Sequence, residues 1–167
     1  AFAVSFDGPI AIRYPRGSAH QGLREYQAPV EYGRSEIIRK GKKIAVLGVG
    51  SMIPSCMKIC KGLKDDGYDP TFVNARFVKP LDVDLLDELA KDHSLFVTVE
   101  ENVKSGGYGE HVSAYMEACH PEIRVLSAAV WDRFVPQGNV ESLRSRIGLG
   151  VEDIRQAIED SEELREQ

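Results

Sequence analysis

Short apolar runs alternate with amphipathic segments from residue 36 onward. Residues 44–47, 71–73, 95–99 and 123–126 are runs of aliphatic, β-branched and aromatic side chains, interrupted only by Arg124. Between them, apolar residues recur every three or four positions, which is the spacing of helices that bury one face. The alternation predicts an α/β fold: a three-layer sandwich with a mostly parallel sheet of about five strands, covered by helices on both faces.

The predicted helices have recognisable boundaries. Ser51 is expected to cap a helix that Gly67 ends, with Pro54 in its first turn, where a missing N–H is harmless. Asp82 is expected to cap a second helix, and the glycine turn 105–107 leads into a third. Two short helices follow near 140–147 and 151–160. The predicted inward-facing residues are Met52, Cys56, Cys60, Leu63, Val83, Leu85, Leu86, Leu89, Tyr108, Val112, Tyr115, Met116 and Cys119.

The first 43 residues follow a different pattern. Residues 36–39, followed by Lys40-Gly41-Lys42, predict an antiparallel edge strand paired with 44–47 in a hairpin. Residues 8–14 predict a buried strand, whereas 18–33 have few aliphatic side chains and read as a linker. We therefore expect residues 1–17 to be the last strand of another domain, 18–35 a linker and 36–167 a complete domain, so that the chain is a fragment of a larger protein.

Composition and charge exclude some classes of partner. The chain is 43% hydrophobic and 28% charged, as in ordinary globular domains. Its apolar runs are far shorter than the roughly 20 residues that span a bilayer, so we expect a cytoplasmic protein without a membrane partner. The net charge of -5 arises in residues 151–167, which contain seven acidic residues and two arginines. The remainder is nearly neutral, which argues against binding to nucleic acid.

Cysteine and histidine positions give no sign of a metal site. Cys56, Cys60 and Cys119 contain no C-x-x-C pair and are expected to be buried thiols in a reducing compartment. His20, His93, His111 and His120 have no metal-ligand spacing among themselves or with the cysteines.

Two motifs at strand ends are weak candidates for a site. Gly48-Val49-Gly50 lacks the third glycine of a dinucleotide fingerprint, because Ile53 stands there, so we interpret it as a tight turn whose amides could attract an anion. Glu100 and Glu101 precede a glycine turn, with His111 beyond it. Neighbouring strand residues point to opposite faces, so we expect one glutamate to cap or form a salt bridge and the other to be solvated.

Arg13 and Arg16 flank a proline at the end of the predicted N-terminal strand. Pro15 ends the strand and places Arg16 just beyond it. A guanidinium there suits an oxyanion such as phosphate. A salt bridge to Glu25 or Glu31 explains the same residues equally well, and the chemistry alone leaves both interpretations open.

Four strings carry a family resemblance that covers nearly the whole chain. "GPIAIRYPRG", "VNARFVKPLD", "VTVEENVKSGGYGEHV" and "DRFVPQG", in this order, closely resemble the C-terminal end of the 1-deoxy-D-xylulose-5-phosphate synthase family. The resemblance implies a homodimeric, three-domain transferase that uses thiamin diphosphate and Mg²⁺ to condense pyruvate with glyceraldehyde 3-phosphate, in isoprenoid and thiamin biosynthesis. It also implies that this chain has a transketolase-like C-terminal domain.

The resemblance assigns one substrate-binding residue to this chain. Arg16 matches the second arginine of "RYPRG", which holds the phosphate of the aldehyde substrate, whereas Arg13 receives no ligand role. The family's catalytic, cofactor-binding and metal-binding residues lie upstream, so the chain alone is expected to bind no cofactor and to be inactive. Two alternatives stay open: a transketolase or 2-oxoacid dehydrogenase beta-type domain, and a purely structural dimerisation domain.

Overall fold

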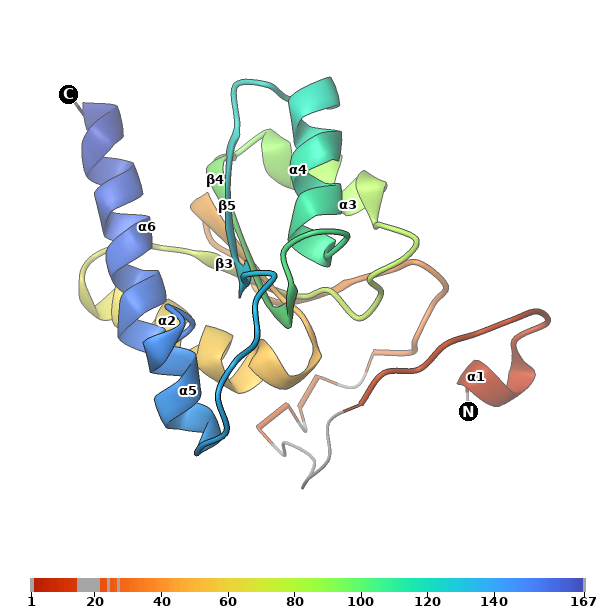
Figure 1. Ribbon diagram of the computed structural model, residues 1–167. Coiled ribbons are helices and arrows are strands. Elements are labelled where there is room, and N and C mark those ends of the chain that lie inside the picture. The colour runs from red at the N-terminus through yellow and green to blue at the C-terminus, as the bar shows by residue number, and fades with distance from the viewer. Residues whose placement is uncertain (1, 15–21, 24, 27, 167) are drawn as a thin grey trace.

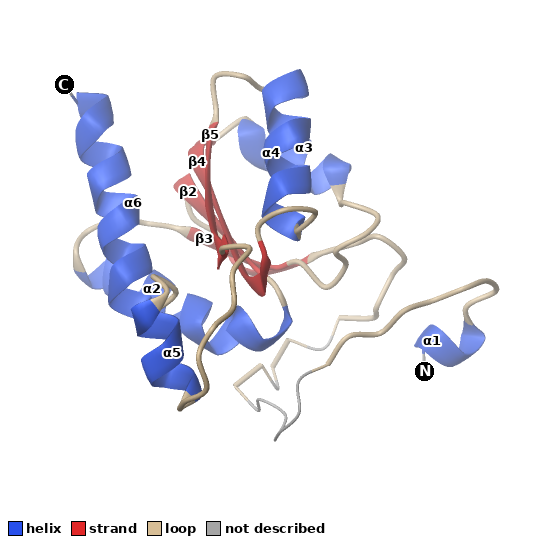
Figure 2. Ribbon diagram, in the orientation of Figure 1, coloured by secondary structure: helices blue, strands red, loops and turns tan. Residues whose placement is uncertain are grey.

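The sheet predicted from the apolar runs is present, with five strands in the order β1-β3-β2-β4-β5. The computed structural model describes residues 2–14, 22–23, 25–26 and 28–166. Four strands run parallel, and β1 is antiparallel to its neighbour β3 at the edge. Figure 2 shows the strands in red between two groups of helices. The strands are β1 (Glu36–Arg39), β2 (Lys43–Gly48), β3 (Thr71–Asn74), β4 (His93–Val103) and β5 (Arg124–Val130).

Helices cover both faces of this sheet, which confirms the three-layer α/β prediction. In Figure 1, α2, α5 and α6 lie on one side of the strands, and α3 and α4 lie on the other. The helices are α1 (Phe2–Ser5), the 3-10 turn η1 (Gly50–Met52), α2 (Ile53–Asp65), α3 (Val83–Ala90), α4 (Tyr108–Cys119), α5 (Val140–Arg146) and α6 (Val151–Glu166). Among the described residues, no helix is both long and apolar enough to cross a membrane.

Each face of the sheet has its own hydrophobic core. On one face, Ile59 and Leu63 of α2 and Ile154 and Ile158 of α6 are fully buried against Val97 and its neighbours. On the other face, α3 and α4 bury a second cluster that includes Leu86, Leu89, Val112, Met116 and Phe96. Each fully buried side chain of this size contributes about 1.5–3 kcal/mol. The central strands therefore lie between two hydrophobic layers, and their ends are the more accessible parts.

The hairpin prediction was wrong about the partner of the edge strand. β1 pairs antiparallel with β3 rather than with β2, which follows it in the sequence. The segment between β1 and β2 crosses the end of β3, because Lys42 N–H donates to the carbonyl of Asp69 at 2.7 Å. Gly41 is required there, since a Cβ would lie 2.1 Å from that same carbonyl oxygen. β3 thus inserts between two strands that are neighbours in the sequence.

The N-terminal strand prediction was also wrong. Residues 9–14 form no regular structure and are exposed. A strand exists through pairing, and no described segment pairs with these residues. The α1 segment is instead held by ring contacts, in which Phe2 packs on Phe77 and Phe6 packs on Tyr32. The division into residues 1–17, 18–35 and 36–167 stays a prediction.

The start of the domain is tied to the segment that follows β3. Arg76 donates to the carbonyls of Ala28 and Pro29 at 3.1 and 3.2 Å and forms a mostly buried ion pair with Glu36 at 2.5 Å. The chain before β1 is therefore fastened to the sheet by its backbone.

Helix caps and buried stripes were predicted unevenly. Asp82 does cap α3, accepting from Leu85 N–H at 3.3 Å, and Gly67 follows the end of α2 in the left-handed region at φ 93°. Ser51 does not cap α2, because its hydroxyl donates elsewhere. Cys56 and Cys60 are buried as expected, whereas Cys119 is exposed because α4 ends there, beyond the edge of its core.

Candidate functional site

The strand order creates one natural place for a ligand at the carboxyl end of the sheet. From β2 the chain passes to β3 on one side and later to β4 on the other, so connections diverge between β2 and β4. In open α/β sheets, ligands bind at such a switch point. There Gly48 is in register with Val99, so that η1 follows β2 directly beside the last residues of β4.

Glu101 is the centre of the polar contacts at this switch point. One carboxylate oxygen, Oε2, accepts from the Ser51 hydroxyl of η1 at 2.7 Å. The other, Oε1, lies 3.1 Å from both Nε and Nη2 of Arg144 on α5. Its main-chain carbonyl accepts from Nη2 of Arg13 at 2.9 Å. A single residue therefore joins the N-terminal segment, the turn after β2 and a helix near the end of the chain.

Glu100, the preceding residue, points to the opposite face of the sheet. It is 2% exposed, and its carboxylate accepts from Tyr108 N–H at 3.0 Å and from Gly109 N–H at 2.8 Å. These are orphan amides in the first turn of α4, so the side chain caps this helix from the neighbouring strand. Burial of the Tyr108 ring, with the Asp82 and Glu100 charges beside it, raises the pKa of its hydroxyl, which stays protonated.

Two glycines allow the start of α4 to approach the sheet closely, one of them beside this buried carboxylate. A Cβ on Gly107 would lie 2.6 Å from Oε1 of Glu100, and a Cβ on Gly109 would lie 2.2 Å from the Ser127 hydroxyl and 2.5 Å from that of Thr98. These two hydroxyls are buried without a hydrogen-bond partner among the described residues. The start of α4 is thus closely packed at Gly107 and Gly109.

The arginine predicted to bind substrate falls in a segment that carries no structural description. Arg16 lies outside the described residues. Arg13 is described, and its partner is the Glu101 carbonyl rather than the carboxylate of Glu25 or Glu31. His111 is exposed on α4 and takes no part in the cluster.

The two glutamates and the Gly48–Gly50 turn agree only in part with their predicted roles. Glu100 caps a helix, as one of the two was expected to do. The expectation that the other glutamate is solvated was wrong, because Ser51 and Arg144 bind the side chain of Glu101. In the Gly48–Gly50 turn, Val49 N–H donates to the carbonyl of Val99 at 3.0 Å, so this amide is taken by β4.

Ser51 and Arg144 are members of the cluster that sequence reasoning missed. Arg144 lies 43 positions after Glu101, and its neighbours give no motif that links the two. Its guanidinium is mostly buried, with 20% of the side chain exposed. Only the packing of α5 beside the end of β4 brings these residues together.

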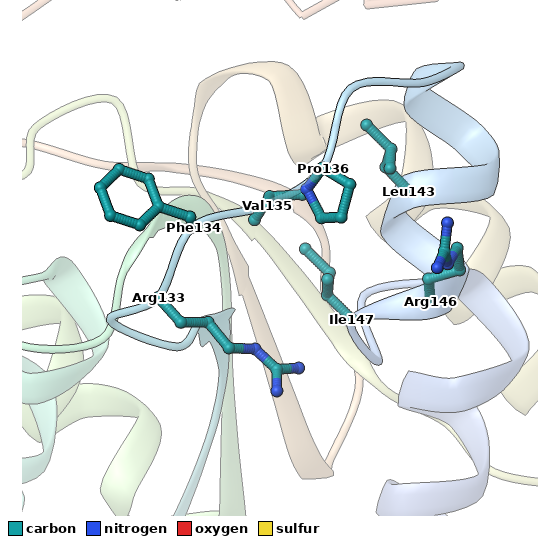
Figure 3. A pocket seen from close by; sticks show the side chains of 7 residues that line it. All are labelled: Arg133, Phe134, Val135, Pro136, Leu143, Arg146 and Ile147. Atoms are coloured by element: carbon teal, nitrogen blue, oxygen red, sulfur yellow. The ribbon is translucent and has the colours of Figure 1, made fainter.

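A cavity of about 270 Å³ lies between the segment 133–136 and the residues of α5 and its C-terminal end. Its lining is mostly apolar and includes two arginines. In Figure 3, Val135 and Pro136 lie opposite Ile147, whereas the Phe134 ring points away from α5. The lining residues are Arg133, Phe134, Val135, Pro136, Leu143, Arg146 and Ile147.

The donor groups at the switch point do not fit a diphosphate with its Mg²⁺. A magnesium site needs free carboxylate or carbonyl oxygens. The Glu100 carboxylate is taken by two amides, and the Glu101 carboxylate by Ser51 and Arg144. Within the described ranges, no three His, Cys, Asp or Glu side chains gather as a metal site.

The buried cysteines are unsuited to nucleophilic chemistry. Burial raises the pKa of the Cys60 thiol to about 12 and raises that of Cys56 well above its usual value. Both thiols therefore stay protonated near neutral pH and act as small apolar groups of the α2 core.

Comparisons with known proteins agree with this fold. Residues 33–154 match the family model described as "Transketolase, C-terminal domain". The chain is 41% identical over 154 residues to the 1-deoxy-D-xylulose-5-phosphate synthase of Lachnoclostridium phytofermentans, covering 92% of this chain and 25% of that protein. It is 39% identical over 157 residues to the corresponding synthase of Dictyoglomus thermophilum, covering 93% and 25%. The chain thus spans about a quarter of the length of these relatives.

Two solved structures with a similar fold are transketolases. A split-gene transketolase, described as an inactive beta4 tetramer, matches with a TM-score of 0.74 at 28% identity, covering 80% of this chain and 43% of that one. A transketolase from Campylobacter jejuni matches with a TM-score of 0.55 at 18% identity, covering 81% and 20%, which supports the fold alone.

Proposed function

The chain belongs to the transketolase C-terminal domain family, and from this premise we propose that it is the C-terminal part of a 1-deoxy-D-xylulose-5-phosphate synthase. The whole enzyme would condense pyruvate with glyceraldehyde 3-phosphate, with loss of carbon dioxide. The similarity to two such synthases, at 39–41% identity over more than nine-tenths of this chain, carries the proposal. Because the chain spans only a quarter of these relatives, the activity is proposed for the whole protein.

The transketolase alternative is less well supported. The match to the split-gene transketolase has 28% identity and covers 80% of this chain. The match to the synthase of L. phytofermentans has 41% identity and covers 92%. The "RYPRG" string at residues 13–17 supports the synthase as well. Both alternatives predict a transferase, and they differ in the substrate that is used.

In this proposal the chain binds and orients substrate, while the thiamin diphosphate supplies the electron sink when it is bound elsewhere in the enzyme. Arg16 is proposed to anchor the phosphate of the aldehyde. Three extended residues span at most about 11 Å, so the chain allows Arg16 to reach the edge of the sheet where Arg13 contacts Glu101.

Arg144 offers a second guanidinium at the same edge of the sheet. Its Nε and Nη2 atoms face Glu101, and no described residue bonds to Nη1. Arginine has five N–H donors, so the end of the guanidinium still has protons for an oxyanion. One charge-assisted hydrogen bond contributes about 1.5–3 kcal/mol, or roughly ten- to a hundredfold in binding.

The proposal is tested by steady-state kinetics of the full-length enzyme with the Arg16→Lys substitution. Lysine keeps the charge but cannot form two parallel hydrogen bonds to a phosphate. We expect the KM for glyceraldehyde 3-phosphate to rise about tenfold or more, with little change in the KM for pyruvate. Equal effects on both substrates would assign Arg16 to a structural salt bridge instead. A wild-type enzyme that forms no 1-deoxy-D-xylulose 5-phosphate would refute the function itself.

We further propose that the 167-residue chain alone binds no thiamin diphosphate and is inactive. The occupied carboxylates at the switch point support this, as does the inactive state of the split-gene transketolase neighbour. The whole enzyme is proposed to be a magnesium-dependent, cytoplasmic homodimer, and the three free cysteines fit a reducing compartment. Calorimetric titration of the chain with cofactor and Mg²⁺ is expected to give no binding heat, and stoichiometric binding would contradict the prediction.

A further inference from the structure

Glu101 forms hydrogen bonds to all three segments that meet at the switch point. Ser51 comes from the turn after β2, Arg144 from α5, and Arg13 from the N-terminal segment. The three segments lie far apart in the sequence. Their polar groups are held together by hydrogen bonds to the two carboxylate oxygens and the one carbonyl oxygen of this single residue.

We propose that Glu101 is a positioning residue for the phosphate subsite, which holds the Arg144 guanidinium so that its free end faces the aldehyde's phosphate. This inference rests on the proposed synthase function. Glu101 itself does not touch the substrate. Its Oε1 lies 3.1 Å from both Nε and Nη2 of Arg144, so it occupies the side edge of the guanidinium. The end edge, which carries Nη1, stays available for a tetrahedral oxyanion.

The hydrogen bond from Ser51 gives the carboxylate a fixed orientation. The hydroxyl lies 2.7 Å from Oε2, on the side of the carboxylate away from Arg144. With both oxygens engaged, the carboxylate can rotate only by breaking a charge-assisted bond. Ser51 in the turn after β2 therefore fixes the Glu101 carboxylate, and this carboxylate in turn fixes the Arg144 side chain on the short helix α5.

The charges in the cluster are compatible with an anionic ligand. Arg13 and Arg144 are cationic and Glu101 is anionic, so these three residues carry a net charge of about +1 when ionised. Glu100 adds a negative charge on the opposite face, where the first-turn amides of α4 bind it. A phosphate on the open side would therefore meet guanidinium groups rather than a free carboxylate.

Substitutions of Glu101 distinguish a positioning role from electrostatic competition with the phosphate. The two roles predict opposite changes in the affinity for the phosphorylated substrate when the side chain is removed. Glu101→Gln keeps an oxygen that accepts from Arg144 and removes the negative charge. Glu101→Ala removes the hold on Arg144 altogether, so that the side chain must be immobilised when the phosphate binds. Ordering one long side chain reduces affinity about two- to tenfold. If the carboxylate merely competed with phosphate for Arg144, both substitutions would instead strengthen substrate binding.

The kinetic test uses the full-length enzyme with the aldehyde in two forms, with and without its phosphate. We expect Glu101→Ala to raise the KM for glyceraldehyde 3-phosphate about two- to tenfold. The KM for pyruvate and the kcat/KM for unphosphorylated glyceraldehyde should not change, and Glu101→Gln should stay within about twofold of the wild type. The matched control is Glu152→Ala, which breaks an exposed Glu–Arg pair on α6 at 2.8 Å and should change none of these values.

A second measurement reports the position of Arg144 without any reaction. In the 167-residue chain, the nitrogen-15 NMR signal of the Arg144 Nε–H group should be resolved and slow to exchange in the wild type. It should remain so in Glu101→Gln and be lost in Glu101→Ala. A signal that is absent in the wild type, or unchanged in Glu101→Ala, would overturn the inference.

The outcomes for the two proposals differ. Equal rises in KM for phosphorylated and unphosphorylated aldehyde, or a lower KM in Glu101→Ala, would overturn the positioning role while the synthase function stands. A wild-type enzyme without condensation activity would overturn the function and, with it, the phosphate subsite. The NMR result would then decide separately whether Glu101 orders Arg144.

Discussion

The two ends of β4 use polar residues in different ways. At the amino end, His93 is 7% exposed, and its partners are the carbonyl of Leu89 at 2.8 Å and the hydroxyl of Thr71 at 2.7 Å. That hydroxyl also accepts from Gly41 N–H at 2.9 Å. At the carboxyl end, Glu101 binds side chains from two other segments, and its carbonyl binds a third. The amino end is a closed network, and the carboxyl end is partly open.

The difference separates groups that build the fold from groups available for function. Polar side chains that bond to main-chain groups of regular elements, such as Glu100 and His93, complete the backbone hydrogen bonding of the fold. Glu101 instead joins side chains that come from separate segments of the chain. We therefore expect substitutions of the first kind to lower stability and substitutions of the second kind to affect ligand binding.

The largest effect on stability is expected for Glu100→Ala. It removes two charge-assisted hydrogen bonds and leaves the buried amides of Tyr108 and Gly109 without their acceptor. Each such loss costs about 1.5–3 kcal/mol, so the free energy of unfolding should fall by about 3–6 kcal/mol in urea titrations. The control is Glu110→Ala, because Glu110 accepts from Gly106 N–H in the same turn but is exposed. A similar loss in both variants would contradict the role of burial.

His93 is expected to make stability depend on pH at the amino end. A carbonyl only accepts, so Nδ1 donates to Leu89 O, and Nε2 accepts from Thr71. Burial lowers the pKa of His93, although the Leu89 carbonyl and Asp92 oppose this shift. The unfolded chain therefore binds the proton more readily than the folded one.

It follows that the contribution of His93 is complete above about pH 6.5 and is lost as the pH falls toward its lower folded pKa. Urea titrations between about pH 7 and 5 should show this loss, and His93→Gln should remove it, with a lower stability throughout of about 1–3 kcal/mol. Replacement of the exposed His111 by alanine is the control and should leave the pH dependence unchanged. A wild-type stability that is flat over this range would contradict the prediction.

A smaller effect is expected where α4 packs on the sheet at Gly109. An alanine Cβ would overlap the hydroxyls of Ser127 and Thr98, at 2.2 and 2.5 Å. Gly109→Ala should therefore lower the stability by about 1–3 kcal/mol despite the better helix propensity of alanine. Ser127→Ala removes a buried hydroxyl that lacks a partner among the described residues, so it should be neutral or stabilising by up to about 1 kcal/mol. The double variant should recover part of the loss, and strict additivity would show that the two sites do not touch.

The smallest effect is expected for the Glu101–Arg144 pair, measured as a double-mutant cycle in urea. The Glu101 side chain is 36% exposed and that of Arg144 20%, so solvent screens their interaction. We expect a coupling of about 0.5–1 kcal/mol in stability. A coupling as large as the loss in Glu100→Ala would place Glu101 among the residues that build the fold and remove the contrast between the two glutamates.

Sequence reasoning succeeded where the signal was local and failed where partners are distant. The caps and stops at Asp82 and Gly67, and the buried stripe of α2, follow from neighbouring residues. The opposite directions of Glu100 and Glu101 follow from strand geometry. The antiparallel partner of β1 could not be deduced, because β3 enters between β1 and β2 from 30 residues or more away along the chain. The same reason hid the contact between Glu101 and Arg144.

By itself, the sequence determined the alternation of strands and helices, the three layers and the family, since hydrophobic periodicity and motif strings are written in consecutive residues. Only the tertiary structure decided which glutamate caps α4 and which one binds Ser51, Arg13 and Arg144. It also showed that the start of α4 is closely packed at Gly107 and Gly109. The physical reason is that a polar side chain acquires its role from the groups that reach it after the core has packed. These groups come from four separate places along the chain.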